Sequence, residues 1–94
     1  MNIIILIPVF NDFKSVSKLI EEIDINISDL NASFSVIVMN DASTEEKILE
    51  TKNLNNIKSL KLINMRNNKG HARCIAAGLK HISENEDFDY VIPM

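Results

Sequence analysis

The chain has 94 residues, of which 46% are hydrophobic and 24% charged, and its formal net charge is −3. This size and balance are typical of one small folded α/β domain. The charge argues against nucleic acid as a partner, because nucleic-acid binding needs a large basic surface. The single cysteine, Cys74, excludes an internal disulfide framework and fits a reducing compartment. We therefore expect a cytoplasmic location, or one at the cytoplasmic face of a membrane.

Strands and helices are predicted to alternate along the chain. The apolar run 2–7 predicts a first strand, since it is too short to span a bilayer. Pro8 should end this strand because proline has no N–H to donate. Apolar residues at three- and four-residue steps predict a helix from about Asp12 or Phe13 to Leu30. The run 34–39 predicts the second strand.

The second half continues the same alternation. Ser43 and Glu46 have the spacing of a capping box, which predicts a helix from near Thr44 to about Asn53. The run 60–65 predicts a third strand, and residues 90–93 predict a fourth. Between them we expect a helix after the loop 67–70, and its apolar face should consist of Ala72, Ile75, Ala76, Leu79 and Ile82.

This alternation predicts a Rossmann-like parallel sheet of about four strands with flanking helices, formed by one unit over 1–94. A ligand is expected at the carboxyl ends of the strands, where such sheets form their crevice. The only glycines are Gly70 and Gly78, so no glycine-rich loop can hold the phosphates of a nucleotide. A bound nucleotide would instead need a divalent metal held by carboxylates.

Three segments carry a resemblance to a known family: IPVFND at 7–12, VMNDAST at 38–44 and RNNKGHARCIAAGL at 66–79. In this order they resemble the signatures of family 2 glycosyltransferases, which have the GT-A fold, and in particular the dolichyl-phosphate mannosyltransferase-like branch. The second signature usually begins with an acid, where this chain has Asn40. The third has one more residue between Arg66 and Gly70 than its nearest pattern.

The resemblance implies the amino-terminal, donor-binding part of an enzyme that transfers a sugar from a UDP- or GDP-sugar to an acceptor hydroxyl or phosphate. It also implies a Mg or Mn ion whose ligands, an Asp-x-Asp motif, would follow Met94, with the catalytic base and acceptor site further on. We therefore assign no catalytic residue to this chain and expect that it does not transfer sugar alone. Membrane association would come from further segments, and an uncovered apolar surface would favour self-association.

The resemblance also assigns roles to the first two segments. Pro8, Val9 and Phe10 would form a wall for the base or ribose, and Asp12 would reach the ribose hydroxyls. Asp12 is equally suited to be a helix N-cap. Asp41 would accept the imide N–H of a uracil, a charged hydrogen bond of roughly 1.5–3 kcal/mol. The alternative is a turn aspartate that accepts local backbone N–H groups.

Arg66 and Gly70 would contact the base or the diphosphate, because a helix N-terminus and a nearby cation both favour an anion. Lys69 and Arg73 add positive charge nearby. The alternative for Arg66 and Lys69 is a solvated loop, and for Arg73 it is a solvent-facing position on the helix. Two other functions remain open from the sequence. One is a non-catalytic nucleotide-binding or regulatory module. The other is a phosphoacceptor domain, which fits poorly because Pro8 stands where an acid pair is expected.

Overall fold

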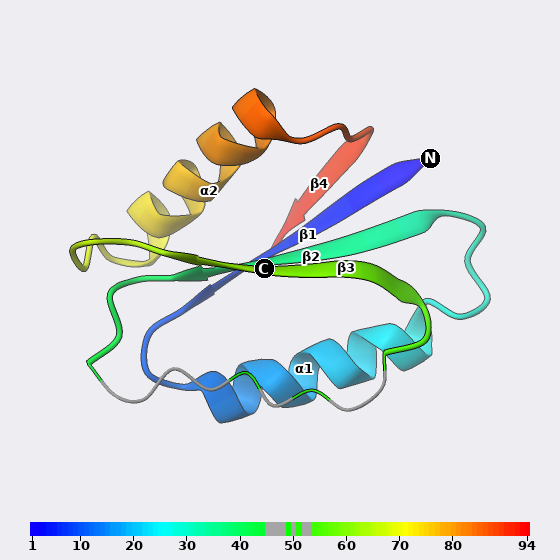
Figure 1. Cartoon of the computed structure of the whole chain (residues 1–94), viewed down its shortest axis with the longest axis horizontal. Coiled ribbons are helices and arrows are strands. Elements are labelled where there is room, and N and C mark those ends of the chain that lie inside the picture. The colour runs from blue at the N-terminus through cyan, green and yellow to red at the C-terminus, as the bar shows by residue number, and fades with distance from the viewer. Residues whose placement is uncertain (45–48, 50, 52–53) are drawn as a thin grey trace.

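The computed structural model describes residues 1–44, 49, 51 and 54–94 (Figure 1). Its elements are β1 (Asn2–Val9), α1 (Phe13–Asn26), β2 (Ser33–Asn40), β3 (Ile57–Asn64), α2 (His71–Asn85) and β4 (Tyr90–Pro93). The four strands form one sheet in the order β3-β2-β1-β4, and every neighbouring pair is parallel. The predicted Rossmann-like α/β fold is confirmed.

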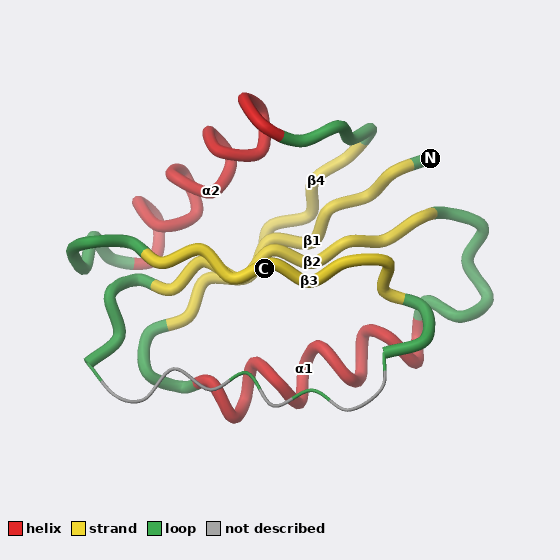
Figure 2. The backbone as a smooth tube through the Cα atoms, viewed as in Figure 1, coloured by secondary structure: helices red, strands yellow, loops and turns green. Residues whose placement is uncertain are grey.

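Helices cover the two faces of the sheet, with α1 on one side and α2 on the other (Figure 2). β1 and β2 lie in the centre, and their sequences are apolar at successive positions because both faces are covered. Ile5 and Val36 belong to the core on the α1 face, whereas Leu6 and Ile37 belong to the core on the α2 face. The fold is therefore held by two cores that share the central strands.

Pro8 lies inside β1, so the prediction that it ends the strand is wrong. The strand continues to Val9, in parallel register with β2. The carbonyl of Leu6 accepts the N–H of Met94, whereas the carbonyl of Val9 accepts the N–H of Asp41 on the β2 side. Since backbone groups alternate between the two neighbouring strands, the nitrogen of Pro8 faces the β4 side, beyond the last paired position of β4. The missing N–H thus removes no β1–β2 hydrogen bond.

α1 begins as predicted but ends before Leu30. Asp12 is its N-cap, and its Oδ1 accepts the backbone N–H of Ser15 at 3.3 Å. Ile27 is the C-cap, and residues 27–29 form a turn in which the N–H of Leu30 donates to the carbonyl of Ile27. The chain turns here to enter β2, which leaves Leu30 56% exposed instead of extending the apolar stripe.

The buried face of α2 is rotated from the predicted one. Cys74, Gly78 and Ile82 are buried at four-residue steps. Of the other predicted positions, Ile75 is half-buried, whereas Ala72, Ala76 and Leu79 are exposed. The reason is Gly78, at which an added Cβ would lie only 2.7 Å from Leu6 Cδ1. The helix lies close against the sheet at this glycine, and the residues one turn away on either side, Cys74 and Ile82, are buried with it.

The predicted helix from Thr44 to Asn53 falls mostly on residues outside those described. Thr44 lies in a bend, and the hydroxyl of Ser43 is used elsewhere, since it accepts the N–H of Asn11 and donates to Asn40. β2 extends one residue beyond its predicted limit at each end, whereas β3 begins at Ile57, before its predicted start at 60, and ends at Asn64, before its predicted end at 65. Among the described residues, no helix is long and apolar enough to cross a membrane.

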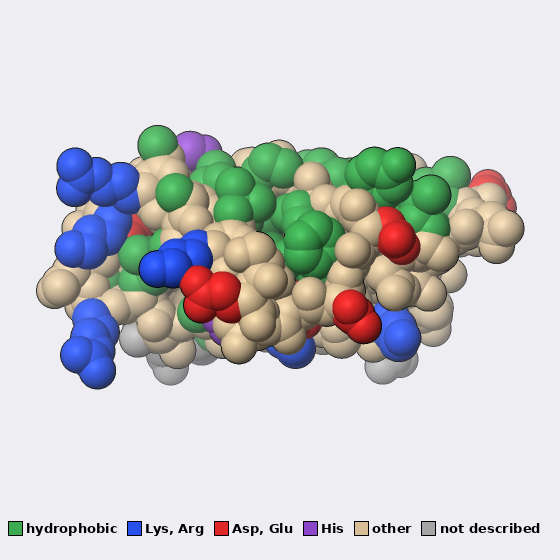
Figure 3. Space-filling model, turned by 90° about the horizontal axis from the view of Figure 1, so that it is seen from above, with side chains coloured by type: hydrophobic (Ala, Val, Ile, Leu, Met, Phe, Trp, Pro, Cys, Tyr) green, Lys and Arg blue, Asp and Glu red, His purple; other side chains and the backbone are tan. Residues whose placement is uncertain are grey.

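The edge strand β4 exposes apolar side chains. Tyr90 and Ile92 are 58% and 45% exposed, and Met94, directly after the strand, is 48% exposed. Tyr90 pairs with Ile3, which packs against the core on the α1 face. The side chain of Tyr90 is therefore on the same face of the sheet as α1, but α1 does not cover it. Exposed hydrophobic side chains are also visible from above in Figure 3. Self-association through such a surface stays a prediction.

Candidate functional site

The order of the strands places a switch point at the carboxyl edge of the sheet. From β1 the chain passes to β2 and then to β3 on one side, and it returns through α2 to β4 on the other side of β1. Open α/β sheets bind ligands outside the carboxyl ends of their strands at such a point. The residues after β1 and β2, together with the start of α2, therefore form the candidate site.

Four of the predicted residues meet in one cavity at this edge. Pro8, Val9, Phe10 and Asp41 line it together with His71, the first residue of α2, and its volume is about 90 Å³. We call this the carboxyl-edge cavity. A larger hollow of about 270 Å³ adjoins the same stretch of β1 on the α1 face. It is lined by Ile7, Pro8, Val9, Phe10, Asp12, Ser15, Val16, Leu19 and Met94.

Asp41 is buried, and both of its carboxylate oxygens are engaged. Oδ1 accepts the backbone N–H of Lys69 at 2.8 Å, and Oδ2 accepts that of Gly70 at 3.0 Å. Its main-chain carbonyl also accepts the side-chain amide of Asn68. These donors come from the loop before α2, not from the local turn. Asp41 therefore fastens the β3–α2 loop to the end of β2, and each oxygen keeps a lone pair for a further donor.

Gly70 can hold this position because of its backbone conformation. Its φ of 86° and ψ of 162° lie in a region that is essentially restricted to glycine. As the N-cap of α2 it has no side chain with which to cap the helix, and its N–H goes to Asp41 instead. The carboxylate thus lies at the helix N-terminus, where a negative charge is stabilised.

A buried amide network ties the strand ends together. Asn40, which is 0% exposed, donates from Nδ2 to Asn64 Oδ1 at 2.9 Å and accepts the N–H of Ser43 at 3.0 Å. The hydroxyl of Ser43 accepts the N–H of Asn11 at 2.8 Å. Asn11 and Ala42, in the loops that the network joins, have positive φ values of 67° and 55°. The network therefore fixes the loops after β1 and β2 relative to the end of β3.

Sequence reasoning missed this network, although a signal was present. Asn11, Asn40 and Asn64 each stand at or just after the carboxyl end of a strand, and parallel strands bring those ends to one edge. It also missed Asp24, a buried acid on the apolar stripe of α1. The Asp24 carboxylate accepts the backbone N–H groups of residues 55–57 at 2.7–3.0 Å. These bonds position the start of β3, far from the carboxyl-edge cavity.

The remaining predicted residues lie around the cavity with fewer contacts. Asp12 is the N-cap of α1, which confirms that reading and leaves its proposed ligand contact a prediction. Phe10 is 48% exposed, so its ring is free to meet a ligand. Arg66, Lys69 and Arg73 are exposed on the β3–α2 loop and the first turn of α2. Figure 3 shows Lys and Arg side chains gathered at the end of the molecule where this loop lies.

Cys74 is a packing residue of the core on the α2 face. It is fully buried one turn into α2, and its Sγ lies 3.6 Å from the carbonyl of Met39. Burial raises the pKa of the Cys74 thiol to about 11, and the nearby charge of Asp41 adds to the effect. A thiol in this state is neutral and inaccessible, which makes it unsuited to nucleophilic or metal chemistry.

The described residues offer no metal site of their own. Within 1–44, 49, 51 and 54–94, no three His, Cys, Asp or Glu side chains are grouped so that they could hold an ion. The ligands that the resemblance implies would lie outside the given sequence, so the metal stays a prediction. Comparisons with protein-family models, curated proteins and solved structures found no match to this chain.

Proposed function

We propose that this chain binds the nucleoside part of a nucleotide-diphospho-sugar, as the donor-binding portion of a GT-A glycosyltransferase of family 2. The observation that carries the proposal is the carboxyl-edge cavity. Two segments that the motifs single out, one after β1 and one after β2, supply four of its five lining residues. The cavity lies at the switch point of the sheet, where nucleotides bind in open α/β folds.

The chemistry of the lining suits a nucleoside. The exposed Phe10 ring offers a face for stacking, which contributes about 1–3 kcal/mol per base in proteins that bind single strands. Asp41 supplies acceptor oxygens held in place by two backbone N–H groups. A carboxylate fixed in this way can accept a hydrogen bond from an imide N–H or a ribose hydroxyl without reorganising, which lowers the entropic cost of binding. The adjoining hollow beside Asp12 gives room for the rest of the donor.

The diphosphate would lie toward the basic end of the molecule. Arg66, Lys69 and Arg73 surround the start of α2 and have no ion pair within the described part of the chain. Guanidinium groups suit phosphate oxygens because they offer paired donors. A divalent metal, when bound, would neutralise the diphosphate and stabilise the leaving nucleotide. The chain's own residues would orient the nucleoside and leave the chemistry to groups outside these 94 residues.

Calorimetry with UDP, GDP and CDP, with and without Mn²⁺, tests the proposal. We expect one nucleotide to bind best and Phe10→Ala to weaken it about tenfold or more, since stacking is lost. Phe88→Ala is the matched control, because Phe88 is also a partly exposed ring but precedes β4 at the opposite edge. Equal losses in the two variants, or no binding of any nucleotide, would refute the proposal.

Asp41 needs a separate readout because it also holds the β3–α2 loop. Asp41→Asn should reduce the preference among the three bases, and an unfolding curve should establish that the variant is folded.

The coding sequence after Met94 separates the enzyme from a non-catalytic module. An Asp-x-Asp directly after Met94, followed by a further domain half, supports the transferase, whereas a stop codon favours the module.

A further inference from the structure

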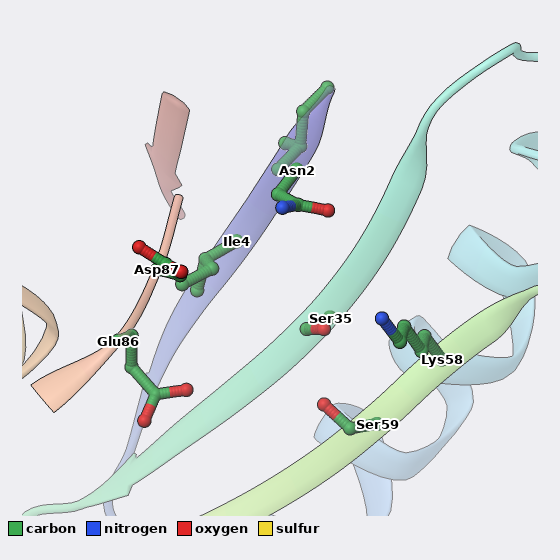
Figure 4. A pocket seen from close by; sticks show the side chains of 8 residues that line it. Asn2, Ile4, Ser35, Lys58, Ser59, Glu86 and Asp87 are labelled. Carbon is green, nitrogen blue, oxygen red and sulfur yellow. The ribbon is translucent and has the colours of Figure 1, made fainter. Parts of the chain in front are cut away.

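A second pocket lies at the amino-terminal edge of the sheet, opposite the carboxyl-edge cavity. Its volume is about 340 Å³, within the range of small-molecule sites. Asn2 and Ile4 of β1, Ser35 of β2, Lys58 and Ser59 of β3, and Glu86 and Asp87 after α2 surround it (Figure 4). We call it the amino-edge pocket.

A β-bulge explains why two polar residues of β3 enter the pocket together. Ile57 pairs with Phe34, but the next pair is Ser59 with Ser35, so Lys58 is an extra residue in the ladder. Ile57 is buried in the core on the α1 face. The bulge therefore directs both Lys58 and Ser59 to the other face, where alternation would have placed only one of them. Bulges recur next to functional sites because they redirect side chains in this way.

The polar side chains of the pocket have few partners. Ser35 is a polar residue of the central strand β2. It pairs with Ile4 of β1, which is buried. No hydrogen bond joins the side chains of Ser35, Lys58, Ser59 or Asp87 to any other described residue. Glu86, in contrast, is paired with Lys61 at 2.9 Å. Hydroxyl groups placed on a sheet face without partners are available to a ligand.

The charges of the pocket define what it can hold. Lys58 stands on β3 at one wall and Asp87 follows α2 at the other, whereas the Glu86–Lys61 pair is neutral as a unit. We propose that the amino-edge pocket binds a small zwitterion of the α-amino acid type. Its carboxylate would accept from Lys58 and the two serine hydroxyls, and its ammonium would donate to Asp87. A dianionic phosphate is disfavoured because the wall opposite Lys58 carries the unpaired carboxylate of Asp87.

Amide chemical shifts of the ¹⁵N-labelled protein test this proposal. Glycine, L-alanine and L-glutamine are the zwitterionic probes, whereas acetate, methylammonium, glucose and inorganic phosphate are the comparison ligands. We expect saturable shifts at Ser35, Lys58 and Asp87 with at least one zwitterion, and much weaker binding of acetate and methylammonium. Lys58→Gln and Asp87→Asn should each weaken binding about tenfold, the effect of one lost charge-assisted hydrogen bond.

The controls and the refuting outcomes are equally specific. Lys80→Gln removes an exposed lysine of α2 outside the pocket, and Asp29→Asn removes an exposed acid of the turn after α1; neither should change affinity. Acetate binding as tightly as the zwitterions would overturn the proposal, as would stronger binding of phosphate or glucose. The absence of saturable shifts with all three zwitterions would also overturn it. None of these results depends on nucleotide binding at the opposite edge.

Discussion

Replacing Asp24 tests whether one buried carboxylate organises the entry to β3. Asp24 is 4% exposed on α1, and its side chain accepts three backbone N–H groups from residues 55–57. The side-chain amide of Asn56 also donates to its main-chain carbonyl at 2.7 Å. No lysine or arginine pairs with Asp24 among the described residues, so the backbone alone compensates its charge.

The geometry sets the size of the expected effect. Oδ1 accepts two of the N–H groups, including that of the buried Ile57 at 2.7 Å, and Oδ2 accepts the third at 3.0 Å. An asparagine keeps one acceptor oxygen and turns an NH₂ group toward the N–H that Oδ2 held. Loss of one charged hydrogen bond costs roughly 1.5–3 kcal/mol, which is our expectation for Asp24→Asn. Asp24→Ala leaves all three donors unpaired and should cost about 3–5 kcal/mol.

The pH dependence follows from the pKa of Asp24. Burial acts to raise the pKa of this carboxyl, but the three backbone hydrogen bonds outweigh it and hold the pKa below its usual value of 3.8. A group with a lowered folded-state pKa stabilises the fold above its unfolded pKa and loses that contribution as the pH falls through the folded pKa. The difference between wild type and Asp24→Asn should therefore be constant near neutral pH and shrink below about pH 4.

Urea unfolding at a series of pH values measures this difference directly. Asp29→Asn is the matched control, because Asp29 is exposed in the turn after α1 and its replacement should change stability by less than about 0.5 kcal/mol. A loss of stability in Asp24→Asn as small as that in this control would show that the Asp24 carboxylate does not organise the entry to β3. A loss that stays the same from neutral to acidic pH would show that its ionised form is not what stabilises the fold.

Two further predictions concern the core on the α2 face. Gly78→Ala should lower stability by about 1–3 kcal/mol in thermal unfolding, although alanine favours helices, because its Cβ would lie 2.7 Å and 2.9 Å from the methyls of the fully buried Leu6. A more stable variant would show that α2 can move away from the sheet. Alkylation of Cys74 by iodoacetamide at pH 8 should be slower in the native protein by roughly two orders of magnitude or more than in urea, since its pKa is raised to about 11 and the thiol is buried. Equal rates would contradict both the burial and the raised pKa.

The apolar runs of β1 and β2 predicted the sheet. A short strand that is apolar on both faces must lie in the centre of a sheet that helices cover on both sides. The errors arose where a contact between distant segments decides the outcome. Pro8 is tolerated in β1 only because the pairing of β4 with β1 ends at Leu6. The close approach of Gly78 to Leu6 determines which face of α2 is buried. Neither can be read from local spacing. For the same reason the sequence located the carboxyl-edge cavity but not the amino-edge pocket, which depends on a bulge.

Asn40 shows how the structure changes the meaning of a departure from a motif. The resemblance leads one to expect an acid at this position, where the chain has an asparagine. Its Oδ1 accepts the backbone N–H of Ser43, which fixes the amide orientation and leaves Nδ2 to donate to Asn64 Oδ1. A carboxylate at this fully buried position would face Asn64 Oδ1 with an acceptor and would need compensation for its charge. Asn40 is therefore the residue that couples the strand ends, and Asp41 alone carries the charge that this stretch presents at the cavity.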